Sequence, residues 1–253
     1  MLEKPKRTQL NRALSKLGLC SRTVGEEKIR LGQVSVNGDV IRDPDFWISL
    51  GVDKVSLNES VSSKTITQND LVYFALHKPA GFVTTRQDEL GRKTIYDLVP
   101  EKISSWIFPV GRLDLESEGL LFLTNDGEWS NLLTDPDFHL EKEYRVKVDG
   151  ILAPESEDIF RNGIELQGSK TFPAKLAADG KNWYRVILEE GRNRQIRRMF
   201  HSLGFKVKKL IRLRIGSFLL GDLKSGEILP LDFTTVSKLR SEAELGKLLR
   251  NKN

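Results

Sequence analysis

The sequence has little of several residue types on which common protein chemistries depend. Cys20 is the one cysteine among 253 residues, which excludes an intrachain disulfide and favours a reducing compartment. Three histidines without metal-ligand spacing cannot build a zinc site with a single cysteine, so we expect no metal. A glycine-rich phosphate-binding loop is also missing, which argues against ATP as a cofactor.

Long hydrophobic runs are absent as well. The longest, such as residues 120–123, have the length of a strand and are too short to cross a bilayer. The N-terminus lacks the apolar core of a signal peptide, and no long apolar or heptad stripe suggests self-association. We therefore expect a cytoplasmic protein without a membrane partner, acting as a monomer.

The positive charge of the chain is concentrated in two segments. Residues 1–38 carry a net charge of +5 and residues 191–214 carry +9, whereas the whole chain carries only +5, so the remaining residues carry −9. Two basic segments on an acidic body predict a docking surface for a polyanion, because neutralising phosphates releases counterions. The alternative is that both segments are ordinary solvated faces.

The N-terminal segment reads as a small helical module followed by a hairpin. Leucines at helical spacing predict a helix that ends at Gly18, and Ser21 can cap a second helix. Residues 34–40 alternate around Asn37-Gly38, a strong hairpin signal. Five cations are expected to project from the two helices: Arg12, Lys16, Arg22, Lys28 and Arg30.

The pattern predicts two domains of the α+β class. A domain over residues 1–62, a polar linker over 63–70, a second domain over 71–235 and a C-terminal tail over 236–253 are expected. In the second domain, strands are predicted at 71–76, 107–110, 119–124, 143–149, 183–189 and 211–216. Helices are predicted at 128–134, 154–161 and 194–203. Without regular βα alternation, this order favours a mixed, largely antiparallel sheet with flanking helices.

Asp114 lies in a polar segment bounded by Gly111 and Gly119, just before an apolar strand. A carboxylate held rigidly in a cleft can act as a nucleophile. The two glycines permit close approach of the backbone to a ligand. By itself, however, an aspartate in a turn is more often structural, because it accepts backbone hydrogen bonds.

Two further segments carry candidate functional side chains. Apolar residues at helical spacing within 194–203 form a buried stripe, with Arg197 at its margin, where it can reach into a cleft and pair with a carboxylate. Tyr144 shares one strand face with Val146 and Val148, a pattern that by itself favours core packing.

These motifs resemble two known families. The two helices followed by "VxVNG" resemble the S4 RNA-binding domain over residues 8–57. The segment 111–127 resembles "GRLDxxSxGLLLLTNDG" of the pseudouridine synthases that modify small- and large-subunit ribosomal RNA. The same family is matched by "KPxG" at 78–81, "KxYxV" at 142–146, "GRxxQIRRM" at 191–199 and "LIRLRIG" at 210–216.

The second resemblance implies an enzyme that converts a uridine of ribosomal RNA to pseudouridine without a cofactor. It implies that Asp114 is the nucleophile, attacking either the sugar carbon or the uracil ring. It also implies that Arg197 pairs with Asp114 and that Tyr144 stacks on the uracil. Besides the five cations above, the RNA-binding candidates are Arg112, Arg192, Arg194, Arg198 and Arg212.

Two other functions compete with this interpretation. A non-catalytic RNA-binding or ribosome-assembly protein could keep the same fold, and residues 8–31 could be a DNA-binding helix-turn-helix. The first is disfavoured because Asp114, Tyr144 and Arg197 are all present, and the second leaves the motif at 111–127 unexplained. For the target, residues 86–99 resemble large-subunit enzymes and residues 127–130 lean towards small-subunit enzymes, which favours the large subunit slightly.

Overall fold

The computed structural model describes residues 7–17, 19–50, 52–59, 62–65, 71–86, 88–101, 103 and 106–250. Contacts within the chain divide it into two units. The N-terminal unit comprises Met1–Tyr73 with Lys102–Phe108 and Thr124–Glu128, and the larger unit comprises Phe74–Glu101, Pro109–Leu123 and Trp129–Asn253. Each unit is described by itself below.

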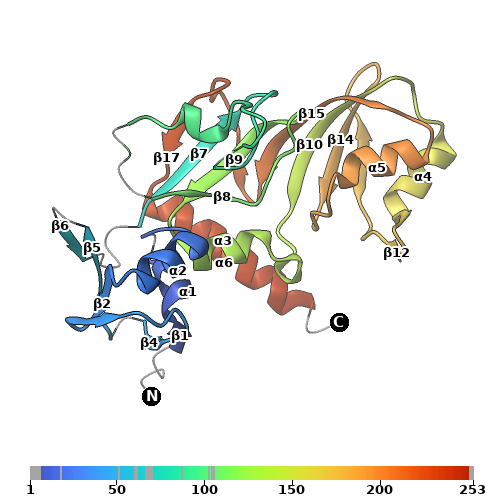
Figure 1. Ribbon diagram of the computed structural model, residues 1–253. Helices are drawn as coiled ribbons and strands as arrows, with labels where there is room; N and C mark the ends of the chain where they lie inside the picture. The colour runs from blue at the N-terminus through green and yellow to red at the C-terminus, as the bar shows by residue number, and fades with distance from the viewer. Residues whose placement is uncertain are drawn as a thin grey trace. The chain divides into compact units, whose positions relative to one another are not determined.

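The N-terminal unit contains the predicted helix pair and hairpin (Figure 1). Helix α1 spans Leu10–Lys16 and α2 spans Arg22–Arg30, while strand β1 (Arg7–Gln9) pairs with β4 (Trp47–Ser49). A second sheet has the order β3-β2-β5-β6, formed by Asp39–Ile41, Val34–Val36, Val55–Glu59 and Ser62–Thr65. Leu10, Leu14 and Ile29 are fully buried against apolar side chains of this sheet, so the helices and the sheet share one core.

The local signals in this unit have the expected geometry. The Ser21 hydroxyl accepts a hydrogen bond from the amide of Val24 at 3.2 Å, which caps α2. Asn37 and Gly38 both have positive φ, 54° and 100°, as the tight turn of a two-residue hairpin requires. Gly18, expected to end the first helix, lies outside the described residues.

The predicted linker at 63–70 is wrong in its first part. Ser62–Thr65 forms strand β6, which pairs with β5 in antiparallel register from Glu59↔Ser62 to Ser56↔Thr65. A polar, serine-rich sequence can add an edge strand because the pairing uses only backbone groups. Residues 66–70 lie outside the described residues.

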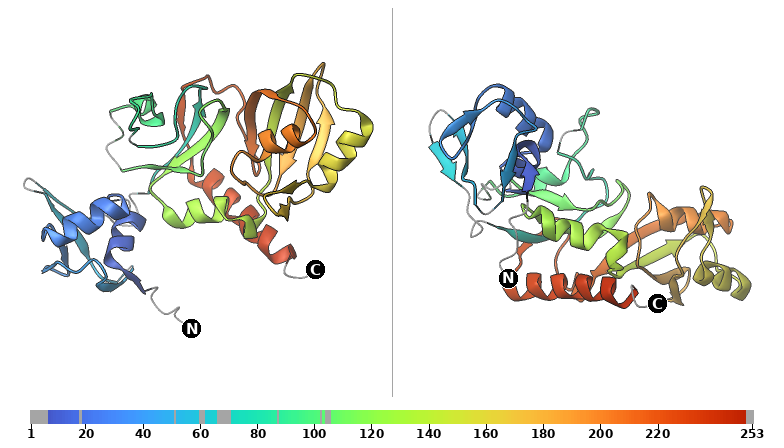
Figure 2. Two further views of the ribbon diagram at one scale, coloured as in Figure 1. Left: turned by 45° about the vertical axis from the view of Figure 1, so that its right-hand side comes forward. Right: turned by 90° about the horizontal axis from the view of Figure 1, so that it is seen from below.

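The larger unit is built on a mixed sheet of nine strands, which confirms the predicted α+β class. Its main path runs β13-β14-β10-β15-β9-β7-β17, with β16 beside β15 and β8 beside β9 (Figures 1 and 2). Strands β9 and β15 pair in parallel, whereas β10 pairs antiparallel with both β14 and β15. The strands in chain order are Tyr73–Lys78 (β7), Phe108–Val110 (β8), Glu118–Thr124 (β9), Lys142–Val148 (β10), Lys175–Ala178 (β13), Trp183–Leu188 (β14), Val207–Ile215 (β15), Phe218–Leu219 (β16) and Ile228–Pro230 (β17).

Two pairs of helices flank this sheet. Helix α4 (Pro154–Asn162) lies beside α5 (Gln195–Ser202), and the rings of Phe160 and Phe200 pack with centroids 4.8 Å apart (Figure 1). Helix α3 (Gly127–Thr134) lies beside α6 (Phe233–Arg250), where the indole of Trp129 donates a hydrogen bond to the carbonyl of Val236 at 3.3 Å. Strands β11 (Glu165–Leu166) and β12 (Ser169–Lys170) form a separate hairpin.

The predicted C-terminal tail over 236–253 is wrong as far as residue 250, because those residues belong to α6. Val236, Leu239 and Ala243 recur at helical spacing and are buried, so this helix contributes to the core of the larger unit. The domain end expected at residue 235 therefore falls inside a helix. No helix of the described part of the chain is long and apolar enough to span a bilayer.

Candidate active site

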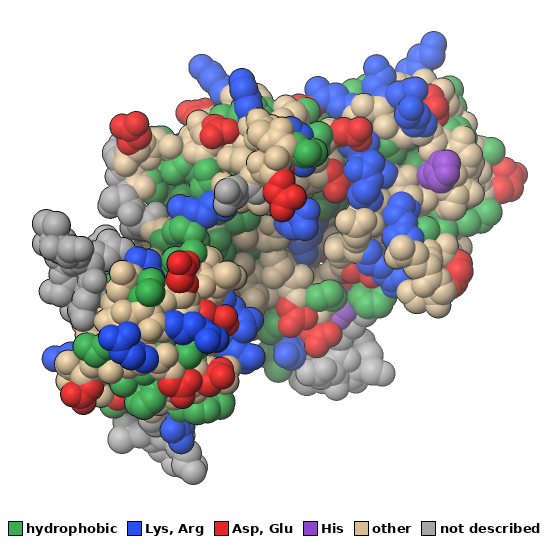
Figure 3. All heavy atoms as spheres, in the orientation of Figure 1, with side chains coloured by type: hydrophobic (Ala, Val, Ile, Leu, Met, Phe, Trp, Pro, Cys, Tyr) green, Lys and Arg blue, Asp and Glu red, His purple; other side chains and the backbone are tan. Residues whose placement is uncertain are grey.

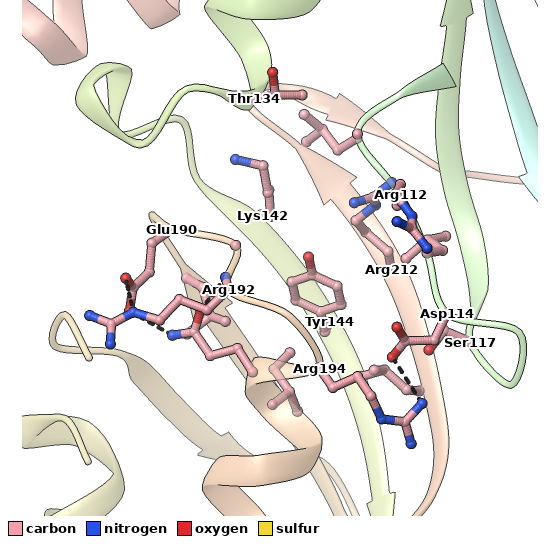
Figure 4. Close-up of a pocket in the computed structure, with 18 of the residues that line it drawn as sticks. Arg112, Asp114, Ser117, Thr134, Lys142, Tyr144, Glu190, Arg192, Arg194 and Arg212 are labelled. Atoms are coloured by element: carbon pink, nitrogen blue, oxygen red, sulfur yellow. Dashed lines mark hydrogen bonds and ion pairs between the residues drawn. The ribbon is translucent and has the colours of Figure 1, made fainter. Parts of the chain in front are cut away.

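A pocket of about 200 Å³ opens in the larger unit, above strands β10 and β15 (Figure 4). One wall is the loop between β8 and β9, and the opposite wall is the loop that precedes α5. Polar side chains from four segments meet here, among them Arg112, Asp114, Lys142, Tyr144, Arg194 and Arg212. Leu188, Leu210 and Ile215 make part of the lining apolar.

A buried lysine donates hydrogen bonds to the backbone of the turn that carries Asp114. Lys78, at the end of β7, is fully buried, and its ammonium donates to the carbonyls of Pro79, Asp114 and Ser117 at 3.0, 3.1 and 2.7 Å. The amide of Ser117 closes the turn by donating to the carbonyl of Asp114 at 3.0 Å. Burial lowers the pKa of Lys78 to about 8. Lys78 thus fixes the backbone of the Asp114 turn, while the Asp114 side chain lines the pocket.

Of the two glycines that bound this segment, Gly119 does not act as expected, whereas Gly111 lines the pocket. Gly119 has a φ of 108°, and a Cβ atom there would overlap the backbone of Arg212 on β15. Gly111 has a φ of 74°, and its added Cβ would lie 3.3 Å from the Thr134 methyl carbon. The close approach that Gly119 permits is therefore between strands β9 and β15, rather than between backbone and ligand.

The first residues of α5 are positioned by a buried carboxylate. Glu190 is buried and accepts hydrogen bonds from the side-chain amide of Gln195 at 2.7 Å and from the amide of Phe172 at 2.9 Å. Arg194, just before the helix, has a left-handed backbone with φ of 49°. The predicted helix start at 194 is therefore one residue early, because Arg194 has the conformation of a cap.

Arg192 is anchored inside the protein. Its guanidinium bonds to the Glu190 carboxylate at 2.9 Å, to the hydroxyl and carbonyl of Ser169, and to the carbonyl of Lys170 at 2.6 Å. Those contacts use four of its five N–H donors and leave its side chain 28% exposed, so RNA binding by Arg192 stays a prediction. Its role here is to connect the α5 loop with the β11–β12 hairpin.

Arg197 lies against Asp114, as the family resemblance implies. Its Nε lies 3.6 Å from the Oδ2 of Asp114, and its Nη2 donates to the hydroxyl of Ser117 at 3.2 Å. A second carboxylate, that of Glu116, lies 3.4 Å from its Nη1. Burial lowers the pKa of Arg197. Since the side chain of Arg197 is 10% exposed and that of Asp114 is 27% exposed, the pair joins a buried guanidinium to an accessible carboxylate.

Arg194 provides a second guanidinium to the same carboxylates. Its Nη1 lies 3.7 Å from Asp114 and its Nη2 lies 3.6 Å from Glu116, with the first contact drawn dashed in Figure 4. Arg194 was expected to bind RNA from a helix face. The structure places it at the rim of the pocket, where it shares both acids with Arg197.

Tyr144 lies at the floor of the pocket, on the buried face of β10 with Val146 and Val148. Across the sheet it is in register with Arg212 of β15. Arg212 is 4% exposed, and its Nε donates to the carbonyl of Leu120 at 2.6 Å. Arg212 is therefore buried at the floor of the pocket, and its expected contact with RNA stays a prediction.

The other RNA-binding candidates lie on surfaces. Arg112 is exposed at the mouth of the pocket, and Arg198 donates to the side chain of Gln167 at 2.9 Å. On the face drawn in Figure 3, Lys and Arg side chains gather over the part of the larger unit that carries α5. Of the five candidates in the N-terminal unit, Arg12, Arg22 and Arg30 are exposed. Lys16 and Lys28 are half-buried.

The sequence pattern alone misses three positions at this site. Lys142 shares a strand face with Tyr144 two residues later, a signal that strand periodicity offers. Ser117 accepts a hydrogen bond from Arg197, which is distant along the chain, and Glu190 accepts one from Arg192 within the folded loop. No local sequence pattern predicts these contacts.

Comparison with known proteins agrees with this geometry. A family model described as RNA pseudouridylate synthase matches residues 72–202. The chain is 38% identical to the ribosomal large subunit pseudouridine synthase B of Bacillus subtilis, over 94% of this chain and 98% of that protein. It is 34% identical to the protein of the same name from Yersinia pestis, over 96% and 83% of the two chains.

A solved structure supports the same assignment. The crystal structure of a pseudouridylate synthase matches 91% of this chain and 99% of its own, with 31% identity and a TM-score of 0.67. The relatives and the solved structure thus match nearly the whole chain, and the family model matches residues 72–202 within it. The chain belongs to the RNA pseudouridylate synthase family.

Proposed function

We propose that this protein converts a uridine of large-subunit ribosomal RNA to pseudouridine. The observation that carries the proposal is the meeting of Asp114 and Tyr144 in one pocket, with Arg197 against the carboxylate. The name of the Bacillus subtilis relative, ribosomal large subunit pseudouridine synthase B, supports the large subunit as the source of the substrate. We further propose that the protein acts as a monomer in the cytoplasm.

The reaction breaks the N1–C1′ bond of the uridine, rotates the uracil and forms a C5–C1′ bond. C5 loses a proton to water and N1 gains one, so atoms balance without a cofactor. Asp114 is the nucleophile, and Arg197 orients its carboxylate through the contacts to both Asp114 and Ser117. Tyr144 provides the ring on which the freed uracil stacks while it turns.

A uridine inside a stacked helix cannot reach this pocket, so the nucleotide must flip out. Flipping costs a few kcal/mol and is easiest in loops and bulges. Contacts to phosphates from exposed cations offset this cost. In the larger unit we assign that role to Arg112 and Arg198. In the N-terminal unit we assign it to the exposed Arg12, Arg22 and Arg30, as expected of an S4-like RNA-binding domain.

The test is a map of pseudouridines in the ribosomal RNA of a strain that lacks this gene. We expect one large-subunit pseudouridine to disappear, to return with the wild-type gene and to stay absent with Asp114→Asn. Loss of a small-subunit site would contradict the target but retain the reaction. An unchanged map, or full restoration by Asp114→Asn, would contradict the proposed catalysis and favour an RNA-binding protein that does not turn over.

A further inference from the structure

Two cations lie at the floor of the pocket beside Tyr144. Lys142 precedes Tyr144 by two residues on β10, and both side chains line the pocket. Arg212 reaches the same floor from β15, in register with Tyr144. Figure 4 shows Lys142 and Arg212 on different sides of the tyrosine ring. A base stacked on Tyr144 would therefore have a cation within its reach on more than one edge.

Neither cation forms an ion pair with a carboxylate among the described residues, unlike Arg192 and Arg194 nearby. Lys142 donates one hydrogen bond to the carbonyl of Leu140 at 3.1 Å. Arg212 donates from Nε to a carbonyl at 2.6 Å, while its buried Nη2 has no hydrogen-bond partner in the described part of the chain. A buried donor without an acceptor is costly, so the site lacks an electron-rich group.

The charges point in the same direction. Burial and the charge of Arg212 together lower the pKa of Lys142 to about 8. Two like charges under one pocket destabilise each other until a negative or carbonyl-rich ligand lies between them. A phosphate is a poor candidate, because the floor is partly apolar and the carboxylate of Asp114 faces the same cavity. A flat pyrimidine with two carbonyl oxygens matches the lining better.

We propose that Lys142 and Arg212 bind the carbonyl oxygens of the flipped uracil and stabilise the negative charge that it acquires in the reaction. This inference rests on the proposed function. When the N1–C1′ bond breaks, its electron pair leaves with N1 and spreads over O2 and O4. If the carboxylate instead adds to C6 of the ring, the electron pair of the C5–C6 double bond moves onto O4. In both routes the two cations donate hydrogen bonds to these oxygens, and neither gains nor loses an atom.

The test compares leaving bases in a single-turnover assay. Short RNAs carrying the target as uridine or as 5-fluorouridine are mixed with excess enzyme, and loss of the N-glycoside is followed by digestion and mass spectrometry. Fluorine withdraws electrons and stabilises the departing anion. We expect Lys142→Gln and Arg212→Gln to be about 100-fold slower than wild type on uridine, as for loss of one charge-stabilising donor. On 5-fluorouridine the deficit should shrink to about 10-fold.

The controls separate this role from a structural one. Lys147→Gln removes an exposed lysine from the same strand, outside the pocket, and should react at the wild-type rate on both RNAs. If Arg212→Gln fails to fold, Lys142→Gln carries the test. Equal deficits on the two RNAs, or no deficit, would overturn the inference. If the wild-type enzyme forms no pseudouridine at all, the proposed function itself is contradicted, which distinguishes that outcome from a failure of this inference alone.

A pH profile gives an independent readout. The charged groups that line the pocket with Lys142 are Arg212 from β15, Arg112 and Asp114 from the β8–β9 loop, and Glu190, Arg192 and Arg194 from the α5 loop. The kcat/KM of the wild type should fall above about pH 8, where Lys142 loses its proton. Lys142→Arg should keep activity within about 10-fold and remove that fall. If the kcat/KM of Lys142→Arg fell above about pH 8 as in the wild type, the role proposed for Lys142 would be contradicted.

Discussion

Replacing Arg197 tests whether the orientation of Asp114, rather than the nearby charge alone, sets the rate. A lysine at this position would keep the positive charge but has a single nitrogen on a shorter side chain. It cannot contact both Asp114 and Ser117 as the guanidinium does at 3.6 and 3.2 Å. We therefore expect Arg197→Lys to be nearly as slow as Arg197→Met.

The magnitude follows from Coulomb's law. Unit charges 3.6 Å apart interact by about 1 kcal/mol in water and about 5 kcal/mol at an effective dielectric constant of 20. With Arg197 10% exposed and Asp114 27% exposed, an intermediate value of about 2–3 kcal/mol is reasonable. For Arg197→Met, which loses the charge, that range corresponds to a decrease of about 30- to 160-fold in the single-turnover rate. Arg197→Lys keeps the charge, and its loss of about 100-fold comes from misplacing the carboxylate by about 1 Å.

The assay is release of tritium from C5 of uridine in an RNA fragment under single-turnover conditions. Lys147→Gln is the control, because Lys147 is exposed on β10, does not line the pocket and is not assigned to RNA binding. It should change the rate less than twofold. The reasoning about orientation would be refuted if Arg197→Lys reacted at the wild-type rate while Arg197→Met did not.

Three further predictions concern stability and RNA binding. Lys78→Met should reduce the free energy of unfolding by several kcal/mol, since three carbonyls lose their donor. In the wild type, the free energy of unfolding should rise by about 3 kcal/mol between about pH 8 and 10.5, because in that range Lys78 is protonated in the unfolded chain but not in the folded one. Lys78→Met should lack this rise when stability is measured by chemical denaturation at each pH. Arg192→Gln should lower the melting temperature and leave the salt dependence of RNA binding unchanged; a lower salt slope would identify Arg192 as a phosphate contact. Replacing the exposed Arg12, Arg22 and Arg30 by glutamine should lower the slope of log K against log salt by about 2–3 in filter binding. An unchanged slope would exclude the N-terminal unit from RNA contact.

Periodicity predicts most of the fold because each strand and helix buries a face of its own. The strand around Tyr144 and the helix after Arg194 are found within about two residues of their predicted bounds. The first strand of the larger unit begins at Tyr73 rather than residue 71. The strand at 62–65 and the helix over 233–250 were missed. A polar edge strand has no apolar face to detect. The helix does carry a signal, because Val236, Leu239 and Ala243 recur at helical spacing, but charged and polar residues surround these few apolar positions.

The site is predicted where a motif fixes the chemistry, as at Asp114 and Arg197, which do meet. Basic character does not predict what a guanidinium contacts. Arg192 and Arg212 belong to a strongly basic segment, yet Arg192 holds a loop and Arg212 is buried at the floor of the pocket. Such contacts depend on which segments the sheet brings together, and Lys142 gains its significance only from Arg212, 70 residues away along the chain but in an adjacent strand.

The most direct test of the central claim is pseudouridine formation by Asp114→Asn in a single turnover on a ribosomal RNA fragment that wild-type enzyme modifies. The amide keeps nearly the shape of the carboxylate but cannot act as the nucleophile. We predict RNA affinity close to that of wild type and no pseudouridine. Pseudouridine formed at a rate comparable with wild type would show that the reaction does not depend on this carboxylate.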